Sequence, residues 1–268
     1  MLIVDSQVHL WNVGTPNPWH RQVPGYTREE LIAEMDAGGV DRAVIVPPMW
    51  AGDVNDMALD AARAYPDRLC VLGRLPLQDP ASRNVFDSWL DQPGMLGMRF
   101  TFGTPEQQGW LYDGSLDWLW PSAERAGFPV MLMVSGHVPT VAGVAEKHPD
   151  LKLTVDHLGL GREVDDAAFA DLPALLELAK YPNVTVKACT LPAYSSEAYP
   201  YANIHQYLRQ VYDAYGARRV FWGSDLTRLP GSYRECVTMF TEELDFLSDA
   251  DREATMGRAL CDWIGWKI

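Results

Sequence analysis

Short hydrophobic runs recur along the 268-residue chain, and each has the length of a β-strand. Several are continuously apolar, which is typical of strands that are covered on both faces. Segments with helical periodicity separate most of these runs. The pattern predicts eight strands, at Leu2–Val8, Arg42–Pro47, Leu69–Leu75, Leu96–Phe100, Pro129–Val134, Leu151–Val155, Val184–Ala188 and Arg219–Gly223.

Helix-start signals lie between the predicted strands. Thr27 and Glu30 have the spacing of a capping box, and Asp79-Pro80 has the order of an N-cap and a first helical residue. Alternating strands and helices indicate a parallel sheet, and eight repeats favour a single (β/α)8 TIM-type barrel over residues 1–268. A doubly wound open sheet is the alternative, but no G-x-G-x-x-G sequence follows the first strand.

Composition narrows the class of protein. Apolar residues make up 47% of the chain and charged residues 22%, which is ordinary for a globular protein. We find no apolar run of membrane-spanning length and no pattern of a secretory signal. The formal net charge of -14 argues against a nucleic-acid partner. The four cysteines show no C-x-x-C spacing, which favours buried thiols and a cytoplasmic location.

Ionisable residues stand at the ends of the predicted strands. In a barrel of this kind the C-terminal ends of the strands meet at one mouth, where active sites form. Gln7 and His9 are two positions apart on the first strand, so their side chains face the same side. The residues that the pattern brings to this mouth are His9, Arg74, Arg99, Ser135, His157, Lys187 and Asp225.

Each of these residues also has a purely structural interpretation. A strand-end arginine can pair with a neighbouring carboxylate, and His9 or His157 can be a core histidine that is bonded to the backbone. Strand alternation predicts that Asp156 faces the helices, because its neighbour His157 faces the barrel. His20 is expected in a loop or helical segment and is not placed in the site.

Five motifs follow one another over nearly the whole chain. They are Asp5-Ser-Gln-Val-His9-Leu-Trp11, Gly97-Met-Arg99, Thr154-Val-Asp-His157-Leu-Gly159, Asn183-Val-Thr-Val-Lys187 and Trp222-Gly-Ser-Asp225. In this order they resemble the amidohydrolase superfamily, and specifically the amidohydrolase-related branch that contains the sugar lactonases and 2-pyrone-4,6-dicarboxylate lactonase. The resemblance implies a barrel enzyme that hydrolyses a small cyclic ester.

The resemblance also bears on a metal cofactor. Metal-dependent relatives carry His-x-His on strand one, histidines on strands five and six, and an aspartate on strand eight. This chain has Gln7 in place of the first histidine and Val134 at the position on strand five. We therefore predict chemistry without a metal. The alternative is one divalent metal, such as Zn or Mn, at His9, His157 and Asp225.

The predicted function is metal-independent opening of a small lactone. The resemblance places Asp225 beside the reacting centre, where burial can raise the pKa of this water-activating base toward working pH. His157 is expected to orient the water or to protonate the leaving oxygen, and His9 to polarise the carbonyl. Substrate contacts are predicted for Arg99, Arg74, Lys187, Gln7, Trp11, Arg228 and Tyr194. An aromatic rim is expected from Trp11, Trp19, Trp50, Trp110, Tyr112 and Tyr194.

Two other functions compete with this prediction. The first is a metal-dependent decarboxylase or hydratase of the same superfamily that acts on a small carboxylated ring or acid. The second is an inactive barrel that only binds a metabolite, which the presence of Asp225 and His157 disfavours. The expected partner is a small molecule. The segment from Trp263 to Trp266 can cap the barrel floor or contact a second copy in a homo-oligomer.

Overall fold

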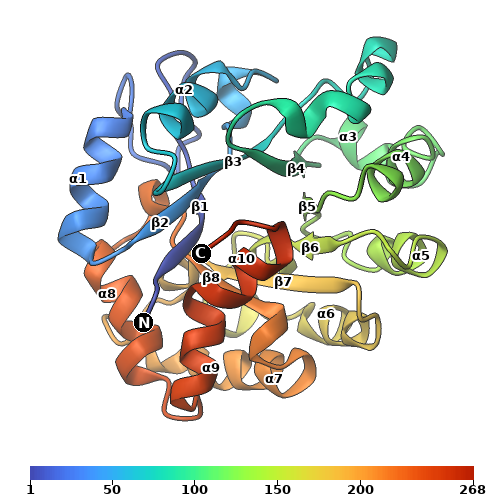
Figure 1. Ribbon diagram of the computed structural model, residues 1–268. Coiled ribbons are helices and arrows are strands. Elements are labelled where there is room, and N and C mark those ends of the chain that lie inside the picture. The colour runs from blue at the N-terminus through green and yellow to red at the C-terminus, as the bar shows by residue number, and fades with distance from the viewer.

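Eight parallel strands form one sheet in the order β1 to β8 in a computed structural model that describes residues 1–268 (Figure 1). All eight predicted strands are present, and the (β/α)8 barrel is confirmed. The strands are β1 (Val4–Val8), β2 (Arg42–Ile45), β3 (Leu69–Gly73), β4 (Met95–Thr101), β5 (Val130–Met133), β6 (Leu153–Val155), β7 (Val184–Cys189) and β8 (Val220–Gly223).

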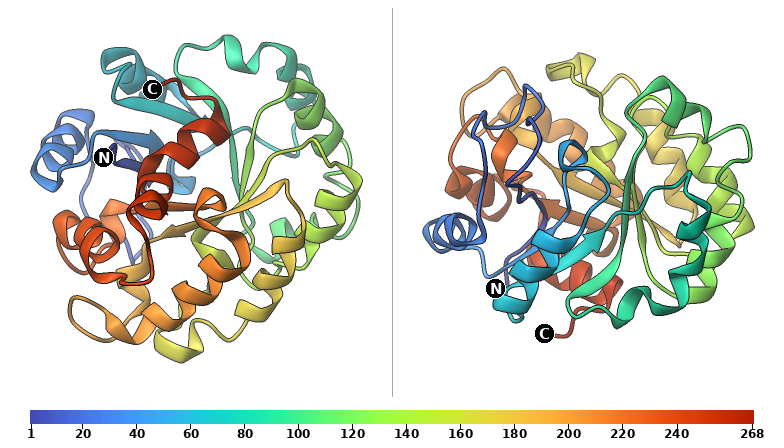
Figure 2. Two further views of the ribbon diagram at one scale, coloured as in Figure 1. Left: turned by 60° about the horizontal axis from the view of Figure 1, so that its bottom comes forward. Right: turned by 90° about the horizontal axis from the view of Figure 1, so that it is seen from above.

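Helices surround the strands (Figures 1 and 2). Thr27 and Glu30 form the predicted capping box of α1, whereas Asp79 caps a 3₁₀ helix at Pro80–Asn84 and not an α-helix. None of the helices combines the length and the apolar character that a bilayer crossing requires. The α-helices are α1 (Arg28–Gly38), α2 (Asp56–Ala64), α3 (Pro105–Gly109), α4 (Leu119–Ala126), α5 (Thr140–Lys147), α6 (Leu172–Glu177), α7 (His205–Tyr215), α8 (Tyr233–Thr238), α9 (Asp249–Glu253) and α10 (Ala259–Ile264). Segments Met239–Glu243 and Ala254–Arg258 are π-helical.

The carboxylate of Asp5 joins the first and last strands of the barrel. It is fully buried and accepts hydrogen bonds from the Ser224 backbone N–H at 2.9 Å and from the Tyr233 hydroxyl at 2.6 Å. The Ser224 hydroxyl also donates to it. Close approach here requires glycine at position 223, because a Cβ on Gly223 would overlap the Ser6 hydroxyl. The join therefore holds the end of β8 against β1.

The N-terminal end of the barrel is filled by a small core. Helix α10 lies at this end (Figure 2) and packs against interior residues such as Val4 and Phe221. Trp263 and Trp266 are partly buried against the same core, so the floor-capping interpretation of this segment is confirmed. A larger core lies between the strands and the helices. All four cysteines are buried and free, as predicted.

Left-handed backbone follows three consecutive strands. His157 has φ 52°, Thr190 has φ 65° and Asp225 has φ 49°. For residues with a Cβ, this conformation costs about 1–3 kcal/mol and tends to occur at functional sites. Left-handed backbone also ends the alternation of side chains between the two faces of the strand. Asp156 is fully buried and bonded to Arg99 on β4, so the expectation that Asp156 faces the helices is wrong.

Candidate active site

Side chains from several strand ends enclose a cavity of about 220 Å³ at the C-terminal end of the barrel. Sites for drug-sized ligands usually measure about 300–1,000 Å³, so this cavity suits a compact substrate. His9, His157 and Asp225 all line it, which confirms that distant segments converge. Gln7, Arg99 and Arg228, three of the predicted substrate-binding residues, line it as well.

The cavity is positively charged within an acidic protein. The lining contains three arginines, Arg99, Arg162 and Arg228, and one carboxylate, that of Asp225, which leaves an excess of two positive charges before any charge on histidine. The whole chain carries -14. Such a local concentration of one sign attracts ligands of the opposite sign. The guanidinium of Arg162 stacks on the Trp19 ring at 3.3 Å, at the exposed rim.

Asp225 is the only carboxylate of the cavity lining and is almost completely buried. Its Oδ1 lies 3.2 Å from His9 Nε2 and accepts no hydrogen bond, while Thr190 donates to Oδ2 at 3.3 Å. Arg228 lies 3.6 Å from Oδ2. Burial raises the pKa of Asp225, but the neighbouring His9 imidazole and Arg228 guanidinium outweigh burial and hold the pKa well below its usual range. The expectation of a raised pKa is therefore wrong.

His9 and His20 both direct an imidazole toward Asp225. The Nδ1 of His9 lies 2.6 Å from the Val46 carbonyl oxygen and donates to it, so Nε2 is left for Asp225. His20 comes from the loop between β1 and α1, and its Nδ1 lies 2.8 Å from the Thr227 hydroxyl. Burial lowers the pKa of His20 to about 3, so this imidazole is neutral. The sequence reasoning missed His20, because no strand pattern marks a loop residue.

Gln7 makes a directed hydrogen-bond chain with His157. Lys187 donates to Gln7 Oε1 at 3.0 Å, and this contact orients the amide so that Nε2 donates to His157 Nε2 at 3.2 Å. His157 Nδ1 then carries the proton and faces the Cys189 thiol at 3.0 Å and the Thr190 hydroxyl at 3.2 Å. Burial lowers the pKa of His157 to about 3. In this arrangement His157 has no proton at Nε2 to give to a leaving oxygen.

Asp156 anchors two cations inside the barrel. Arg99 Nε donates to Oδ2 at 2.7 Å, and Lys187 Nζ lies 3.0 Å from Oδ1. Burial raises the pKa of Asp156, but Lys187 and Arg99 outweigh it and lower the pKa to about 2. Arg99 also donates to Thr101. Its bond to Asp156 confirms the interpretation of Arg99 as an arginine paired with a carboxylate, although Arg99 also lines the cavity. Lys187 is fully buried and does not line the cavity.

Three other predicted substrate contacts also lie outside the cavity lining. Arg74 is paired with Asp53 at 3.2 Å, and burial together with the charge of Arg99 lowers its pKa to about 10. Trp11 is fully buried against Trp50, at 5.4 Å between ring centroids. Tyr194 lies beneath the guanidinium of Arg228, at 5.8 Å. Of the expected aromatic rim, Trp19 and Trp50 line the cavity, and Trp110 and Tyr112 line a different one.

His9, His20 and Asp225 together fit a divalent cation. Their ligand atoms all lie within 4.8 Å of one another. The free Oδ1 of Asp225 and the Nε2 of His9 are 3.2 Å apart, close to the separation of about 3.3 Å between two ligands of tetrahedral zinc. The bond from His9 to Val46 is of the kind that orients metal-bound histidines. His20 therefore takes the place that the sequence alternative gave to His157.

Comparison with known proteins supports one family. The amidohydrolase family model matches residues 4–259. L-fucono-1,5-lactonase of Burkholderia ambifaria is 25% identical over 249 residues, covering 86% of this chain and 82% of that protein. The 4-sulfomuconolactone hydrolase of Hydrogenophaga intermedia is 24% identical over 237 residues, covering 82% and 73%.

Solved structures share the fold. An amidohydrolase from Burkholderia multivorans, crystallised with zinc, has a TM-score of 0.82 at 21% identity, covering 99% of both chains. A probable 2-pyrone-4,6-dicarboxylic acid hydrolase from Acinetobacter baumannii has a TM-score of 0.73 at 19% identity, covering 99% and 100%. The 2,6-dihydroxybenzoate decarboxylase from Rhizobium has a TM-score of 0.71 at 15% identity, covering 99% of both. With the family model matched from β1 to α10, the chain belongs to the amidohydrolase family.

Proposed function

We propose that this protein hydrolyses a small carboxylated lactone, with Asp225 as the base and without a required metal. One observation carries the proposal. The cavity holds a single ionised carboxylate with a free oxygen, and the other formal charges that line it are arginines. The two curated relatives, a lactonase and a lactone hydrolase, support the reaction class.

The proposed reaction begins with water held at Oδ1 of Asp225. As the water oxygen attacks the lactone carbonyl, Asp225 accepts its proton, and the guanidinium of Arg228 stabilises the developing oxyanion. The ring C–O bond then breaks, and the proton passes to the ring oxygen through the adjoining Asp225 and His9 pair, which yields a hydroxy acid. A carboxylate with a low pKa is a weak base, which suits an ester better than an amide, because the ester oxygen leaves more readily.

The residues around Asp225 bear on metal use. A divalent cation bound by His9, His20 and Asp225 would act as a Lewis acid on the carbonyl. However, Gln7 stands where metal-dependent relatives carry a histidine, and its N–H occupies the lone pair of His157 Nε2. Val134 offers no ligand atom at all. The residues at positions 7 and 134 therefore support the metal-independent proposal.

Substrate recognition is assigned to the positive and polar parts of the wall. Arg162 is exposed at the rim and free to bind a carboxylate in the two-pronged manner of arginine. Trp50 also lines the cavity and adds an aromatic surface to its wall. Arg99 and Gln7 line the cavity but are already bonded to Asp156 and Lys187. We therefore propose that Arg99 and Gln7 hold the cavity wall in place and do not bind the substrate directly.

The test is hydrolysis of a lactone panel by purified protein. Pairs of lactones with and without a carboxylate should show preference for the carboxylated member. Asp225→Asn should lower kcat by about 10²–10⁴, the range for a lost general base, and chelation should leave the wild-type rate unchanged. Asp245→Asn, the same substitution at an exposed position outside the cavity, serves as the control. Full activity of Asp225→Asn, or loss of activity on chelation that zinc restores, would refute the assignment.

A metal-dependent decarboxylase or hydratase is the second candidate function. The His9, His20 and Asp225 set favours it, and solved relatives of the same fold include a decarboxylase crystallised with manganese. Carbon dioxide release from carboxylated aromatic acids, strictly dependent on added Zn or Mn, distinguishes it from lactone hydrolysis.

A further inference from the structure

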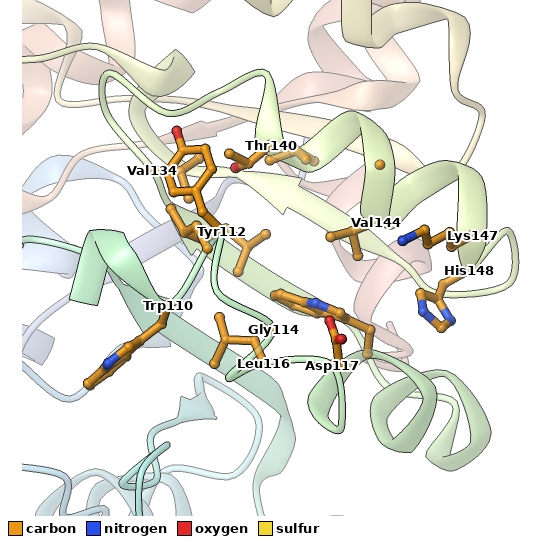
Figure 3. A pocket seen from close by; sticks show the side chains of 15 residues that line it. Trp110, Tyr112, Gly114, Leu116, Asp117, Val134, Thr140, Val144, Lys147 and His148 are labelled. Carbon is orange, nitrogen blue, oxygen red and sulfur yellow. The ribbon is translucent and has the colours of Figure 1, made fainter. Parts of the chain in front are cut away.

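A second cavity lies outside the barrel, against α4 and α5 (Figure 3). We call it the flank cavity; its base is formed by the buried side chains of Leu116, Trp120, Leu132 and Val141. Its volume is about 550 Å³, larger than the catalytic cavity and within the range of small-molecule sites. The proposed hydrolysis uses none of its residues.

Strand β5 separates the flank cavity from the catalytic cavity. Leu132 and Val134 line the flank cavity, whereas Met133 between them lines the catalytic cavity. This division follows from strand geometry, because successive side chains point to opposite faces. A molecule in the flank cavity therefore lies behind the barrel wall and cannot reach Asp225. The two cavities are distinct sites.

Gly143 opens one wall of the flank cavity. It lies within α5, where glycine is less favourable than any other residue except proline. A Cβ at this position would have no atom within 4 Å, so packing inside the chain does not require glycine. Gly143 is exposed, so the space that the missing side chain leaves is open to solvent at the mouth of the cavity. A ligand can therefore approach the backbone of α5 closely at this position.

Unpaired charges complete the cavity. Lys147 of α5 and Asp117 of the segment before α4 both line it (Figure 3). Both residues are exposed, and neither side chain makes a hydrogen bond or salt bridge. His148 differs, because it is paired with Glu124 at 2.9 Å. A carboxylate matches Lys147, whereas Asp117 has the same sign of charge as a carboxylate and is not used in the proposed contact. The apolar base beside them matches a flat hydrophobic body.

We propose that the flank cavity binds a small molecule with an aromatic or alicyclic body and one carboxylate. The body packs against Trp120 and Leu132 in the space beside Gly143, and the carboxylate pairs with Lys147. The proposal stands independently of the lactonase assignment, because it concerns binding at residues that lie outside the barrel.

The test is binding of 2-naphthoate, measured by calorimetry on the full chain, with a crystal of the complex to locate it. Gly143→Leu should weaken binding more than tenfold, because its side chain fills the cavity, whereas Gly143→Ala should bind like wild type. Lys147→Gln should weaken binding about fivefold, the effect of a partly exposed ion pair. The matched control is Lys180→Gln, an exposed lysine outside the cavity.

Thermal melting checks that each variant is folded, and Lys147→Gln keeps the test decisive if Gly143→Leu does not fold. The uncharged analogue 2-naphthylmethanol should bind to the wild type more weakly than 2-naphthoate does. The two ligands should bind to Lys147→Gln with equal affinity. Three results would overturn the proposal: unchanged affinity in both Gly143→Leu and Lys147→Gln, naphthoate found only in the catalytic cavity, or a dimer in solution that covers Lys147 and Gly143.

Discussion

Replacement of Lys187 by methionine tests the polar network beneath the site. The ammonium group is completely buried, and its Nζ lies 3.0 Å from both Asp156 Oδ1 and Gln7 Oε1. Methionine fills a similar volume but cannot donate. Asp156 would keep only Arg99, and Gln7 Oε1 would lose its only hydrogen bond.

The pKa of Asp156 gives the expected magnitude. The difference between the ordinary pKa of 3.8 and a pKa of about 2 corresponds to roughly 2 kcal/mol in favour of the charged form. Lys187 is the largest cause that lowers this pKa. Breaking a buried ion pair costs roughly 3–5 kcal/mol. Since Arg99 remains, we expect Lys187→Met to lower the free energy of unfolding by about 3 kcal/mol near pH 7.

The pH dependence has a definite sign. Because the folded-state pKa of Asp156 lies below its unfolded value, this stabilisation is complete above about pH 4 and is lost as the pH falls toward 2. In Lys187→Met, burial prevails and the pKa of Asp156 rises. The variant should therefore begin to lose stability on acidification at a higher pH than wild type.

Urea unfolding at several pH values measures both effects. Lys180→Met, at an exposed position, is the control and should change stability by less than about 0.5 kcal/mol. The double variant Lys187→Met with Asp156→Asn should be less destabilised than the sum of the single variants, because the two side chains interact directly. A loss below 1 kcal/mol for Lys187→Met, with an acid limb like that of wild type, would refute the reasoning.

Three further predictions address other parts of the molecule. Arg162→Gln should raise KM for a carboxylated lactone about fivefold, as expected for a partly exposed ion pair, with kcat unchanged; an equal rise for an uncharged lactone would contradict this role. His20→Asn should weaken zinc binding, measured by calorimetry, at least tenfold if His20 is a ligand, and unaltered affinity would remove it from the set. Asp5→Asn should lower the free energy of unfolding by about 2 kcal/mol, since it weakens the buried hydrogen bonds that join β1 to β8. Urea unfolding measures this loss, and an unchanged midpoint would contradict the prediction.

The local hydrophobic pattern of the sequence was sufficient to predict the barrel fold. Strands that are buried on both faces are rich in apolar residues, so the sequence by itself marked all eight within a few residues of their ends. Strand order then placed His9, Arg99, His157 and Asp225 at one mouth, because parallel strands present their C-terminal ends together.

Tertiary structure alone decided which of these groups face the substrate cavity. Alternation misplaced Asp156, since left-handed backbone at His157 ends the strand there. His20 and Arg162 reach the cavity from loops, and no local pattern records where a loop folds back. The low pKa of Asp225 depends on its contacts with His9 and Arg228, and the orientation of Gln7 depends on Lys187. Such properties arise from distances between residues far apart in the chain, which a one-dimensional pattern does not contain.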